Sequence, residues 1–546
     1  MFVMKISNMF VIGLLSTLLL MTSCDQNKVV YLPEPPENPI VRPEKPDAPE
    51  EPATPPENPV TPPDEKPETN SDLSLPYIFS DNMVLQQNAQ VAIYGTDRAG
   101  VEVTVVPSWS GTPYKGVTGV DGNWFIRIDT PSASYTTHTI KITDTDGGEL
   151  SISDVLVGEV WLCSGQSNME HPMKGFNYGE TNHEPVDDYS TEITDSDYQY
   201  LRYFRVPKNV SRIPLYDTEP AKWVKCTRQS APDWSAIGFF FGRSIHKKVG
   251  VPVGIVACPY GGTRIEGWMP ESLVSTLAAN TIKRDGLTGG EQSPSYPSNC
   301  YNAMMHPVID FGYRGMLWFQ GETNSDALAW AYAGHLRDIV KAWRERMGVT
   351  ADKLPFYYVQ LAPWVTTWED AATLRHCQFR GVGFGTPLIE NCGIVGASDV
   401  GSEVTIHFPQ KKVIADRLVL WAMHNQYGDR NVNPMGPYYM SHTVQGNKVI
   451  VTMANADGLR YIDGAEKVLH AEIAPAPVKI NNKTVYDWTE ADVEILSDGR
   501  LSFSSTTVSS PEHVRYCFST WHVGTLCNGA GLPLFPFSTE KYSKIN

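Results

Sequence analysis

Short hydrophobic runs that alternate with polar residues fill the chain from about residue 75 to 155. The clearest of these runs are residues 90–94, 101–105, 124–128 and 138–142. Turn sequences rich in Asp and Gly, at 121–123 and 146–148, separate neighbouring runs. Runs of this length with turns between them predict a small antiparallel β-sandwich.

The pattern changes from about residue 156 to 428, where apolar runs alternate with stretches of helical periodicity. The candidate strands are residues 158–163, 252–258, 315–320, 356–361 and 393–397. Helices are predicted over about 327–347, with Gly348 placed to end the helix, and over about 411–427. This alternation predicts an α/β fold in which helices flank an open parallel sheet. Ligands bind such sheets at the carboxyl ends of the strands.

Strand-like runs return from about residue 430 to 546, at 448–453, 471–474 and 513–518. We interpret this part as a second β-domain. Several folded units are expected in a chain of 546 residues, because a single core rarely extends over that length.

The N-terminus has the pattern of an export signal. Lys5 precedes an apolar stretch over 9–21 that is too short to span a bilayer. The residues Met21-Thr22-Ser23-Cys24 resemble a bacterial lipobox, in which Cys24 is acylated and becomes the mature N-terminus. The alternative is an ordinary cleaved signal peptide in which Cys24 has no role. We expect a lipoprotein that is exported to the periplasm or the cell surface and attached to the outer membrane.

A tether follows the signal segment, with proline recurring every few residues from Pro33 to Pro67 among Glu, Asp and Lys. Such a sequence favours extended polyproline II and has almost nothing to bury. The predicted organisation is a signal peptide over 1–24, a tether over 25–73, an N-terminal β-domain over 74–156, the α/β domain over 157–428 and a C-terminal β-domain over 429–546.

The composition of the chain argues against some classes of function. The chain has 44 Lys and Arg against 61 Asp and Glu, and the net charge of −17 argues against a nucleic-acid partner.

Cys517 and Cys527 are close enough in sequence for a hairpin disulfide, whereas Cys163 and Cys258 lie in predicted strands as buried thiols. The sequence has no H-E-x-x-H motif or cysteine cluster, so we expect no metal and no other cofactor.

The first candidate for chemistry follows the first strand of the α/β region, in the sequence from Gly158 to Glu170. A strand and a glycine turn place the Ser167 hydroxyl at the sheet edge, where backbone N–H groups can stabilise an oxyanion. The segment does not fit the G-x-S-x-G motif of the α/β-hydrolases. On spacing alone, Ser167 is more typical of a turn residue or a helix cap.

Three further polar segments follow later strands. Gly261 and Gly262 let the backbone approach a ligand, and the Gly262 N–H can donate into an oxyanion hole, although an isolated Gly-Gly pair is usually a turn. Residues 320–324 are polar groups that a fold buries only when they form hydrogen bonds, and Asn324 can supply a side-chain N–H to the same oxyanion. The loop before the 411–427 helix contains His407, and a lone histidine is more often structural than catalytic.

Taken together, these segments resemble the SGNH hydrolase superfamily, and within it the sialate O-acetylesterases and related carbohydrate acetylesterases. The resemblance extends over about residues 75–540. It includes Leu85-Gln86-Gln87 and residues 157–161, 297–304, 354–362 and 528–537. Its specific parts are the Ser167 segment and the sequence Gln320-Gly321-Glu322. The resemblance implies an SGNH-type fold and a carbohydrate O-acetylesterase activity.

The resemblance also implies roles for individual residues. Ser167 matches the nucleophile and His407 matches the general base. The backbone N–H groups of Ser167 and Gly262 and the side-chain N–H of Asn324 match the oxyanion hole. The candidate substrate contacts are Gln166, Gln320, Glu322, Arg264 and Trp268.

The sequence leaves open which acid orients His407. Many members of the family have Asp two residues before the histidine and Pro directly after it, and this chain has Thr and Phe there. Asp399 matches an acid of the family's Asp-x-Gly stretch, Glu403 is the nearest carboxylate in sequence and Glu322 is a third option. A backbone carbonyl can also take this role.

The expected reaction is a two-step acyl transfer that removes O-acetyl groups from sugars, sialic acids first among them. An O-acetylated glycan is then the substrate, and the membrane is a partner through the lipid anchor. The alternatives are the same chemistry on xylan, xyloglucan or pectin, a glycan-binding lipoprotein without catalysis, and a structural spacer at the cell surface.

Overall fold

The computed structural model describes residues 71–176, 189–366, 370–382, 387–462 and 464–542. The signal segment with Cys24 and almost all of the tether therefore lie outside the described residues. Residues 68–546 form one compact unit. In the part of the chain that is described, no helix has the length and hydrophobicity needed to cross a membrane.

The centre of this unit is a largely parallel sheet with the strand order β13-β12-β11-β7-β10-β8-β9. Its strands are β7 (Glu149–Gly165), β8 (Tyr198–Arg205), β9 (Trp223–Cys226), β10 (Val253–Pro259), β11 (Gly315–Phe319), β12 (Phe356–Val359) and β13 (Cys392–Val395). Neighbours are parallel except β8 and β9. The predicted α/β class with an open parallel sheet is confirmed, and the antiparallel β8–β9 edge was not predicted.

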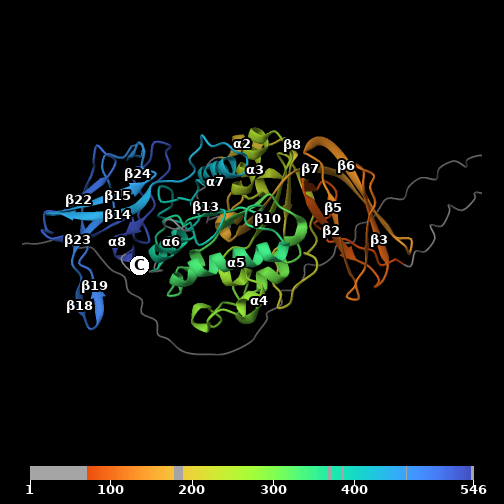
Figure 1. Cartoon of the computed structure of the whole chain (residues 1–546), viewed down its shortest axis with the longest axis horizontal. Helices are drawn as coiled ribbons and strands as arrows, with labels where there is room; N and C mark the ends of the chain where they lie inside the picture. The colour runs from red at the N-terminus through yellow and green to blue at the C-terminus, as the bar shows by residue number, and fades with distance from the viewer. Residues whose placement is uncertain (1–70, 177–188, 367–369, 383–386, 463, 543–546) are drawn as a thin grey trace, which may run out of the picture. The chain divides into compact units, whose positions relative to one another are not determined.

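Helices cover both faces of this sheet (Figure 1). One face packs against α3 (Ala236–Val249) and α7 (Lys411–Asn425), the other against α5 (Tyr332–Met347) and α6 (Ala371–Arg380). Helix α5 ends as predicted at Gly348, whose φ of 65° is left-handed. The other α-helices are α1 (Ser167–Glu170), α2 (Ser190–Thr194), α4 (Glu271–Val274) and α8 (Thr539–Tyr542). The single turns are η1 (Ala231–Asp233), η2 (Ile265–Trp268), η3 (Ala279–Thr281), η4 (Gly290–Gln292), η5 (Tyr301–Met305), η6 (Ile309–Phe311), η7 (Glu322–Asn324) and η8 (Ala329–Ala331).

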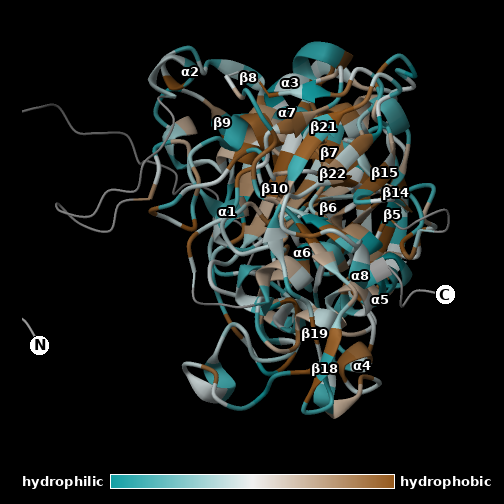
Figure 2. Cartoon of the chain, turned by 90° about the vertical axis from the view of Figure 1, so that its left-hand side faces the viewer, coloured by the Kyte–Doolittle hydropathy of each residue, from teal (hydrophilic) through white to brown (hydrophobic). Residues whose placement is uncertain are grey.

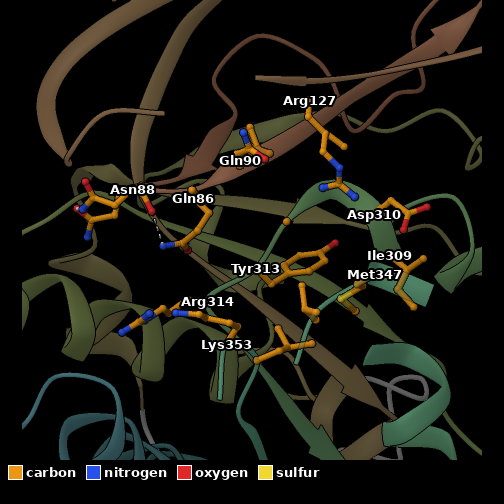
Figure 3. A pocket seen from close by; sticks show the side chains of 17 residues that line it. Gln86, Asn88, Gln90, Arg127, Ile309, Asp310, Tyr313, Arg314, Met347 and Lys353 are labelled. Carbon is orange, nitrogen blue, oxygen red and sulfur yellow. Dashed lines mark hydrogen bonds between the residues drawn. The ribbon is translucent and has the colours of Figure 1, made fainter. Parts of the chain in front are cut away.

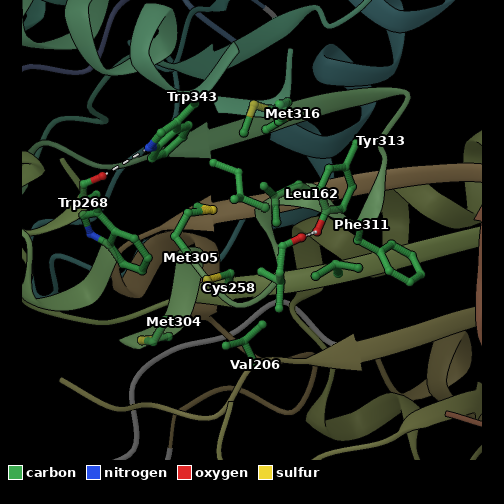
Figure 4. Packing of buried hydrophobic residues seen from close by; sticks show 14 of the residues in the cluster. Leu162, Val206, Cys258, Trp268, Met304, Met305, Phe311, Tyr313, Met316 and Trp343 are labelled. Atoms are coloured by element: carbon green, nitrogen blue, oxygen red, sulfur yellow. Dashed lines mark hydrogen bonds between the residues drawn. The ribbon is translucent and has the colours of Figure 1, made fainter. Parts of the chain in front are cut away.

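Strand β7 explains why both faces of the sheet are covered. Its residues Val160 and Leu162 belong to the core cluster beneath α5, while Trp161 and Cys163 belong to the cluster beneath α3 and α7. Successive side chains of a strand point to opposite faces, so a strand buried on both sides is hydrophobic throughout. Figure 2 shows the hydrophobic residues gathered in the interior, and Figure 4 shows the packing around Leu162.

The N-terminal β-region is continuous with this sheet through β7. The first half of β7 pairs with β1 (Val84–Gln86) and β6 (Ser134–Asp144), and the second half pairs with β10 and β11. The other strands of this region are β2 (Gln90–Thr96), β3 (Glu102–Pro107), β4 (Tyr114–Val117) and β5 (Asn123–Asp129). One strand thus runs through the expected boundary at 156, and the division into separate domains stays a prediction.

The C-terminal region packs around a core of its own, which includes Val449, Ile473 and Phe503. Its strands are β14 (Tyr438–Gln445), β15 (Lys448–Ala454), β16 (Arg460–Tyr461), β17 (Ala471–Pro475), β18 (Val478–Ile480), β19 (Lys483–Val485), β20 (Thr489–Glu490), β21 (Asp492–Ile495), β22 (Leu501–Ser504), β23 (Pro511–Tyr516), β24 (Leu526–Cys527) and β25 (Phe537–Ser538). Cys517 is a buried free thiol, so the expected hairpin disulfide with Cys527 is wrong. Cys163 and Cys258 are buried thiols, as expected.

Candidate active site

The carboxyl ends of the three central strands meet at one edge of the sheet. Gly165 at the end of β7 lies in register with Pro259 of β10 and Phe319 of β11. The segments that contain Ser167, Gly262 and Asn324 follow directly after these strands. The parallel topology therefore brings together three polar segments that are far apart in the sequence.

The turn that presents Ser167 depends on Gly165. Its φ of 134° is a conformation that favours glycine, and a Cβ atom at this position would lie 2.1 Å from the carbonyl oxygen of Phe319. The next N–H, that of Gln166, donates to the same carbonyl at 2.9 Å. The chain then enters α1 at Ser167. The Ser167 hydroxyl is thus fixed at the end of a rigid buried strand.

The glycine pair after β10 packs against the candidate nucleophile. A Cβ atom on Gly261 would lie 3.2 Å from Cβ of Ser167, so a larger residue would press on the serine. The Gly261 N–H donates to Oε2 of Glu170 at 3.1 Å, and Gly262 follows with a left-handed φ of 74°. This close approach keeps the Gly262 backbone beside Ser167, where an oxyanion donor is needed.

A cavity of about 700 Å³ opens above these strand ends. Ser167, Gly262 and His407 all line it, with Gln166 and Thr323 beside them. Ser167 and His407 are 9% and 8% exposed, so both side chains are largely desolvated. The candidate nucleophile and the candidate base therefore share one cavity, although the loop of His407 follows β13, the edge strand of the sheet.

Asn168 connects the two catalytic segments. Its side-chain amide donates to the carbonyl oxygen of Ile406 at 3.2 Å and to the carboxylate of Glu322. Lys411 donates to Oδ1 of Asn168 at 2.5 Å and to the carbonyl oxygen of Phe408 at 2.6 Å. Sequence reasoning missed Asn168 and Lys411, and their only sequence signal is that they lie within four residues of Ser167 or His407.

The three candidate acids differ in their surroundings. Asp399 forms a two-pronged ion pair with Arg417, at 2.8 and 2.5 Å, and Glu403 is exposed. Glu322 is buried; burial raises the pKa of this carboxyl, while Asn168 and the charges on His407 and Lys411 lower it. Glu322 therefore interacts electrostatically with His407. Among the three acids left open by the sequence, these surroundings favour Glu322, and the identity of the orienting acid stays a prediction.

The amide of Asn324 is fixed by its neighbours. Its Oδ1 accepts the Ile265 N–H at 3.0 Å and Nε2 of Gln320 at 2.8 Å, so the oxygen end of the amide is defined. Its Nδ2 donates to Oε2 of Glu266 at 2.9 Å, and Arg264 holds the other oxygen of Glu266 at 3.1 Å. The Glu266 contact uses one of the two Asn324 N–H groups and leaves the other for the expected oxyanion contact, although Asn324 is buried and only its neighbour Thr323 is among the described residues that line the cavity.

The candidate substrate contacts divide into two groups. Gln166 lines the cavity, whereas Arg264, Gln320, Glu322 and Trp268 are buried beneath it. Arg264 is bound to Glu266 and to Asp326, and it also lines a neighbouring cavity. Trp268 is fully buried, and its backbone oxygen accepts a hydrogen bond from Trp343 at 3.2 Å (Figure 4). The Trp268 ring is therefore part of the core, which does not favour Trp268 as a substrate contact.

A second cavity, of about 360 Å³, lies at the amino ends of β11 and β12 (Figure 3). Gln86, Arg127, Tyr313 and Arg314 are among its lining residues. Its described lining has no serine, cysteine or histidine, so it does not contain the Ser–His pair predicted for acyl transfer. The chemistry predicted from the sequence belongs to the cavity at the carboxyl edge.

Comparison with known proteins finds similarity to carbohydrate esterases. Residues 157–414 match the family described as carbohydrate esterase, sialic acid-specific acetylesterase. This match includes all four of the segments that carry the candidate chemistry, from Ser167 to His407.

Individual relatives agree with the family match. The rat sialate O-acetylesterase is 27% identical over 500 residues, which are 81% of this chain and 89% of the relative. The human sialate O-acetylesterase is 27% identical over 391 residues, 66% of this chain and 72% of the relative. Among solved structures, a carbohydrate acetylesterase from Xanthomonas citri superposes with a TM-score of 0.71 at 27% identity, covering 85% of this chain and 99% of the other.

Proposed function

We propose, from the premise that the chain belongs to the carbohydrate esterase family of sialic acid-specific acetylesterases, that it deacetylates O-acetylated sialic acids. The chain is a carbohydrate esterase that removes O-acetyl groups from sugars, which confirms the reaction expected from the sequence. The plant polysaccharide substrates and the non-catalytic glycan binder are not favoured.

The observation that carries the proposed mechanism is the shared cavity of Ser167, Gly262 and His407. His407 accepts the proton of the Ser167 hydroxyl while the oxygen attacks the acetyl carbonyl. The tetrahedral intermediate then breaks its bond to the sugar oxygen, which takes the proton from His407 and leaves as a hydroxyl. Water attacks the acetyl-enzyme and gives a proton to His407, which passes it to the Ser167 oxygen as acetate leaves.

The negative charge of each tetrahedral intermediate falls on the former carbonyl oxygen. The backbone N–H groups of Ser167 and Gly262 and the side-chain N–H of Asn324 are the proposed donors to it. Such fixed donors in a largely desolvated cavity stabilise the charge without reorganising, and this is usually the largest single contribution to catalysis.

Glu322 is the proposed partner for the positive charge that His407 gains in each step. Its carboxylate is held by Asn168, whose amide also contacts the residue before His407. An ionised carboxylate that faces the imidazolium stabilises it and fixes the ring orientation.

Acetate release from an O-acetylated sialic acid tests this function. We expect activity in the wild type and none in Ser167→Ala, while Ser272→Ala, a change of an exposed serine on α4, keeps the wild-type rate. A fluorophosphonate should label the wild type on Ser167 alone. Full activity in Ser167→Ala would refute the mechanism, and activity on acetylated xylan but not on the sialic acid would refute the substrate.

We also propose that the protein is an exported lipoprotein attached through Cys24. The support is the lipobox-like sequence 21–24 after an apolar stretch and before the proline-rich segment. Labelling of cells with a palmitate analogue should mark the wild type and not Cys24→Ser. Equal labelling of both would refute the anchor and leave the esterase function untouched.

A further inference from the structure

Two cationic side chains that line the catalytic cavity share one carboxylate oxygen. Nη2 of Arg205 lies 3.0 Å from Oε1 of Glu170, and Nζ of Lys208 lies 2.6 Å from the same atom. All three residues line the cavity with Ser167 and His407. The Glu170 side chain is 5% exposed, whereas those of Arg205 and Lys208 are 47% and 41% exposed. The carboxylate is thus buried beneath two cations that still face the cavity.

This arrangement leaves positive charge in excess at the cavity wall. Glu170 carries one negative charge against two positive ones, and its second oxygen accepts the Gly261 N–H at 3.1 Å. The other charged pair on the described lining is Lys174 with Asp233, which match one to one at 2.5 Å. The Lys174–Asp233 pair contributes no net charge, so it does not cancel the excess at Arg205 and Lys208.

The excess is unusual for this protein, because the whole chain has a net charge of −17. An acidic protein repels an anionic substrate at long range, so a local cluster of cations must provide the attraction. Lys208 also lies 5.2 Å from the centre of the Tyr260 ring, a contact that keeps its stem against the cavity wall.

We propose that Arg205 and Lys208 form a subsite that binds the carboxylate of an acidic sugar while its acetyl ester lies at Ser167. The proposal rests on the esterase function and adds recognition of substrate charge to it. A guanidinium can bind a carboxylate with two parallel hydrogen bonds, and the ammonium group of Lys208 adds a second, more mobile charge. Neutral sugars such as xylose offer no group for this subsite.

Two classes of sugar carry the required carboxylate: sialic acids and the uronic acids of acetylated pectin. Their chemistry at the subsite is the same, so the assay must separate them. The first comparison uses an O-acetylated sialic acid and its methyl ester, which differ only in the charge of the carboxyl group. The second uses acetylated polygalacturonate, and acetylated xylan serves as the uncharged polymer.

The measured quantity is the ratio of kcat/KM for acetate release from the free acid to that from the methyl ester. We expect the wild-type ratio to be about 10 or more, as for a charge-assisted hydrogen bond. Arg205→Gln and Lys208→Gln should each lower the ratio, and the double variant should bring it to about 1. Lys174→Gln is the matched control, because Lys174 lines the same cavity with a partner of its own, and it should keep the wild-type ratio.

The outcomes separate the subsite from the proposed function. A wild type that deacetylates the sialic acid and its methyl ester equally well would overturn the subsite and leave the function standing. A wild type that acts only on polygalacturonate, with a rate that falls in Arg205→Gln, would support the subsite and overturn the sialic acid substrate. Binding of N-acetylneuraminic acid and of galacturonic acid to Ser167→Ala, measured by calorimetry, gives a readout without turnover. Unchanged affinity for both sugars on adding the Arg205→Gln and Lys208→Gln changes would overturn the subsite.

Discussion

The side-chain amide of Asn168 donates to the carbonyl oxygen of Ile406 at 3.2 Å, and so joins the residue after Ser167 to the residue before His407. Lys411 binds the oxygen of the same amide and so fixes which way the amide faces. The relative position of nucleophile and base therefore depends on one side chain that takes no part in the chemistry.

Asn168→Ala should lower kcat about 10- to 100-fold with little change in KM, since a small misplacement of reacting groups has effects of this order. Asn168→Asp keeps the oxygen that faces Lys411 and removes the donor to Ile406, so it should be at least as slow. The control is Asn209→Ala, whose amide binds Glu219 near the surface. Steady-state kinetics with p-nitrophenyl acetate measure kcat and KM separately. An unchanged kcat in Asn168→Ala would contradict the positioning role.

Glu322→Gln should lower kcat about 10²- to 10⁴-fold, as expected when the acid that faces the base loses its charge. The same change should stabilise the fold at neutral pH by about 1 kcal/mol or more, because an ionised buried carboxyl is replaced by a neutral group. Burial raises the pKa of Glu322 in the folded state above its unfolded value, so wild-type stability falls as pH rises between the two values.

The stability gain of Glu322→Gln should therefore shrink at acid pH, where the wild-type carboxyl is protonated. Urea unfolding at several pH values measures it, beside kcat at neutral pH. A variant that is both fully active and no more stable would remove Glu322 from the mechanism. Asp399→Asn serves as the comparison, because it breaks the ion pair with Arg417 and should cost stability.

Glu266 should influence catalysis through Asn324, whose amide it orients. Asn324→Ala should lower kcat about 10²- to 10³-fold, the usual loss for an oxyanion donor. Glu266→Ala should also lower kcat, and the double variant should be no slower than Asn324→Ala. This non-additivity, measured as a double-mutant cycle with unfolding curves as the check on folding, would be absent if the two residues acted independently.

His171 should make the enzyme sensitive to acid. Its ring is buried 6.2 Å from the ring of His407, and neither of its nitrogens has a hydrogen-bond partner among the described residues. Burial lowers the pKa of His171 to about 2. The folded state therefore favours the neutral ring, and stability is lost as pH falls below the unfolded value of about 6.5.

His171→Phe should flatten this loss by up to about 1.4 kcal/mol per pH unit between pH 6 and 4. Phe suits the site because the imidazole packs edge to face against Phe176 at 5.0 Å. Chemical unfolding of both proteins over this pH range measures the difference. Parallel stability curves would mean that other groups account for the acid sensitivity.

The hydrophobic runs were sufficient to predict the parallel strands, because such runs are properties of neighbouring residues. Ser167, Gly262 and His407, which line the cavity, were identified through the family resemblance and not from spacing alone. The direction in which side chains next to the motifs point could not be predicted from neighbouring residues. Arg264 and Trp268 directly follow the glycine pair, and they turn inward to bind Glu266 and to pack in the core.

The contacts between distant segments could not be predicted either. Asn168 meets Ile406 only after β7 and the segment after β13 are folded into one edge, and no periodicity connects the two positions. Arg205 ends β8 and Lys208 follows it, and only the second half of this strand is buried, so its hydrophobic pattern was too weak to recognise. The sequence left the acid open for the same reason, because Glu322 and His407 follow different strands, β11 and β13.

Strand β7 runs without interruption from Glu149 to Gly165, with its first half in the N-terminal β-region and its second half beneath Ser167. A truncated protein that starts at residue 157 would lack β1 and the first half of β7. The edge of β7 that pairs with β1 would then be exposed. The N-terminal region is therefore part of the scaffold of the nucleophile and should unfold with it in a single cooperative transition. Proteolysis that separates the two should inactivate the enzyme without touching the cavity.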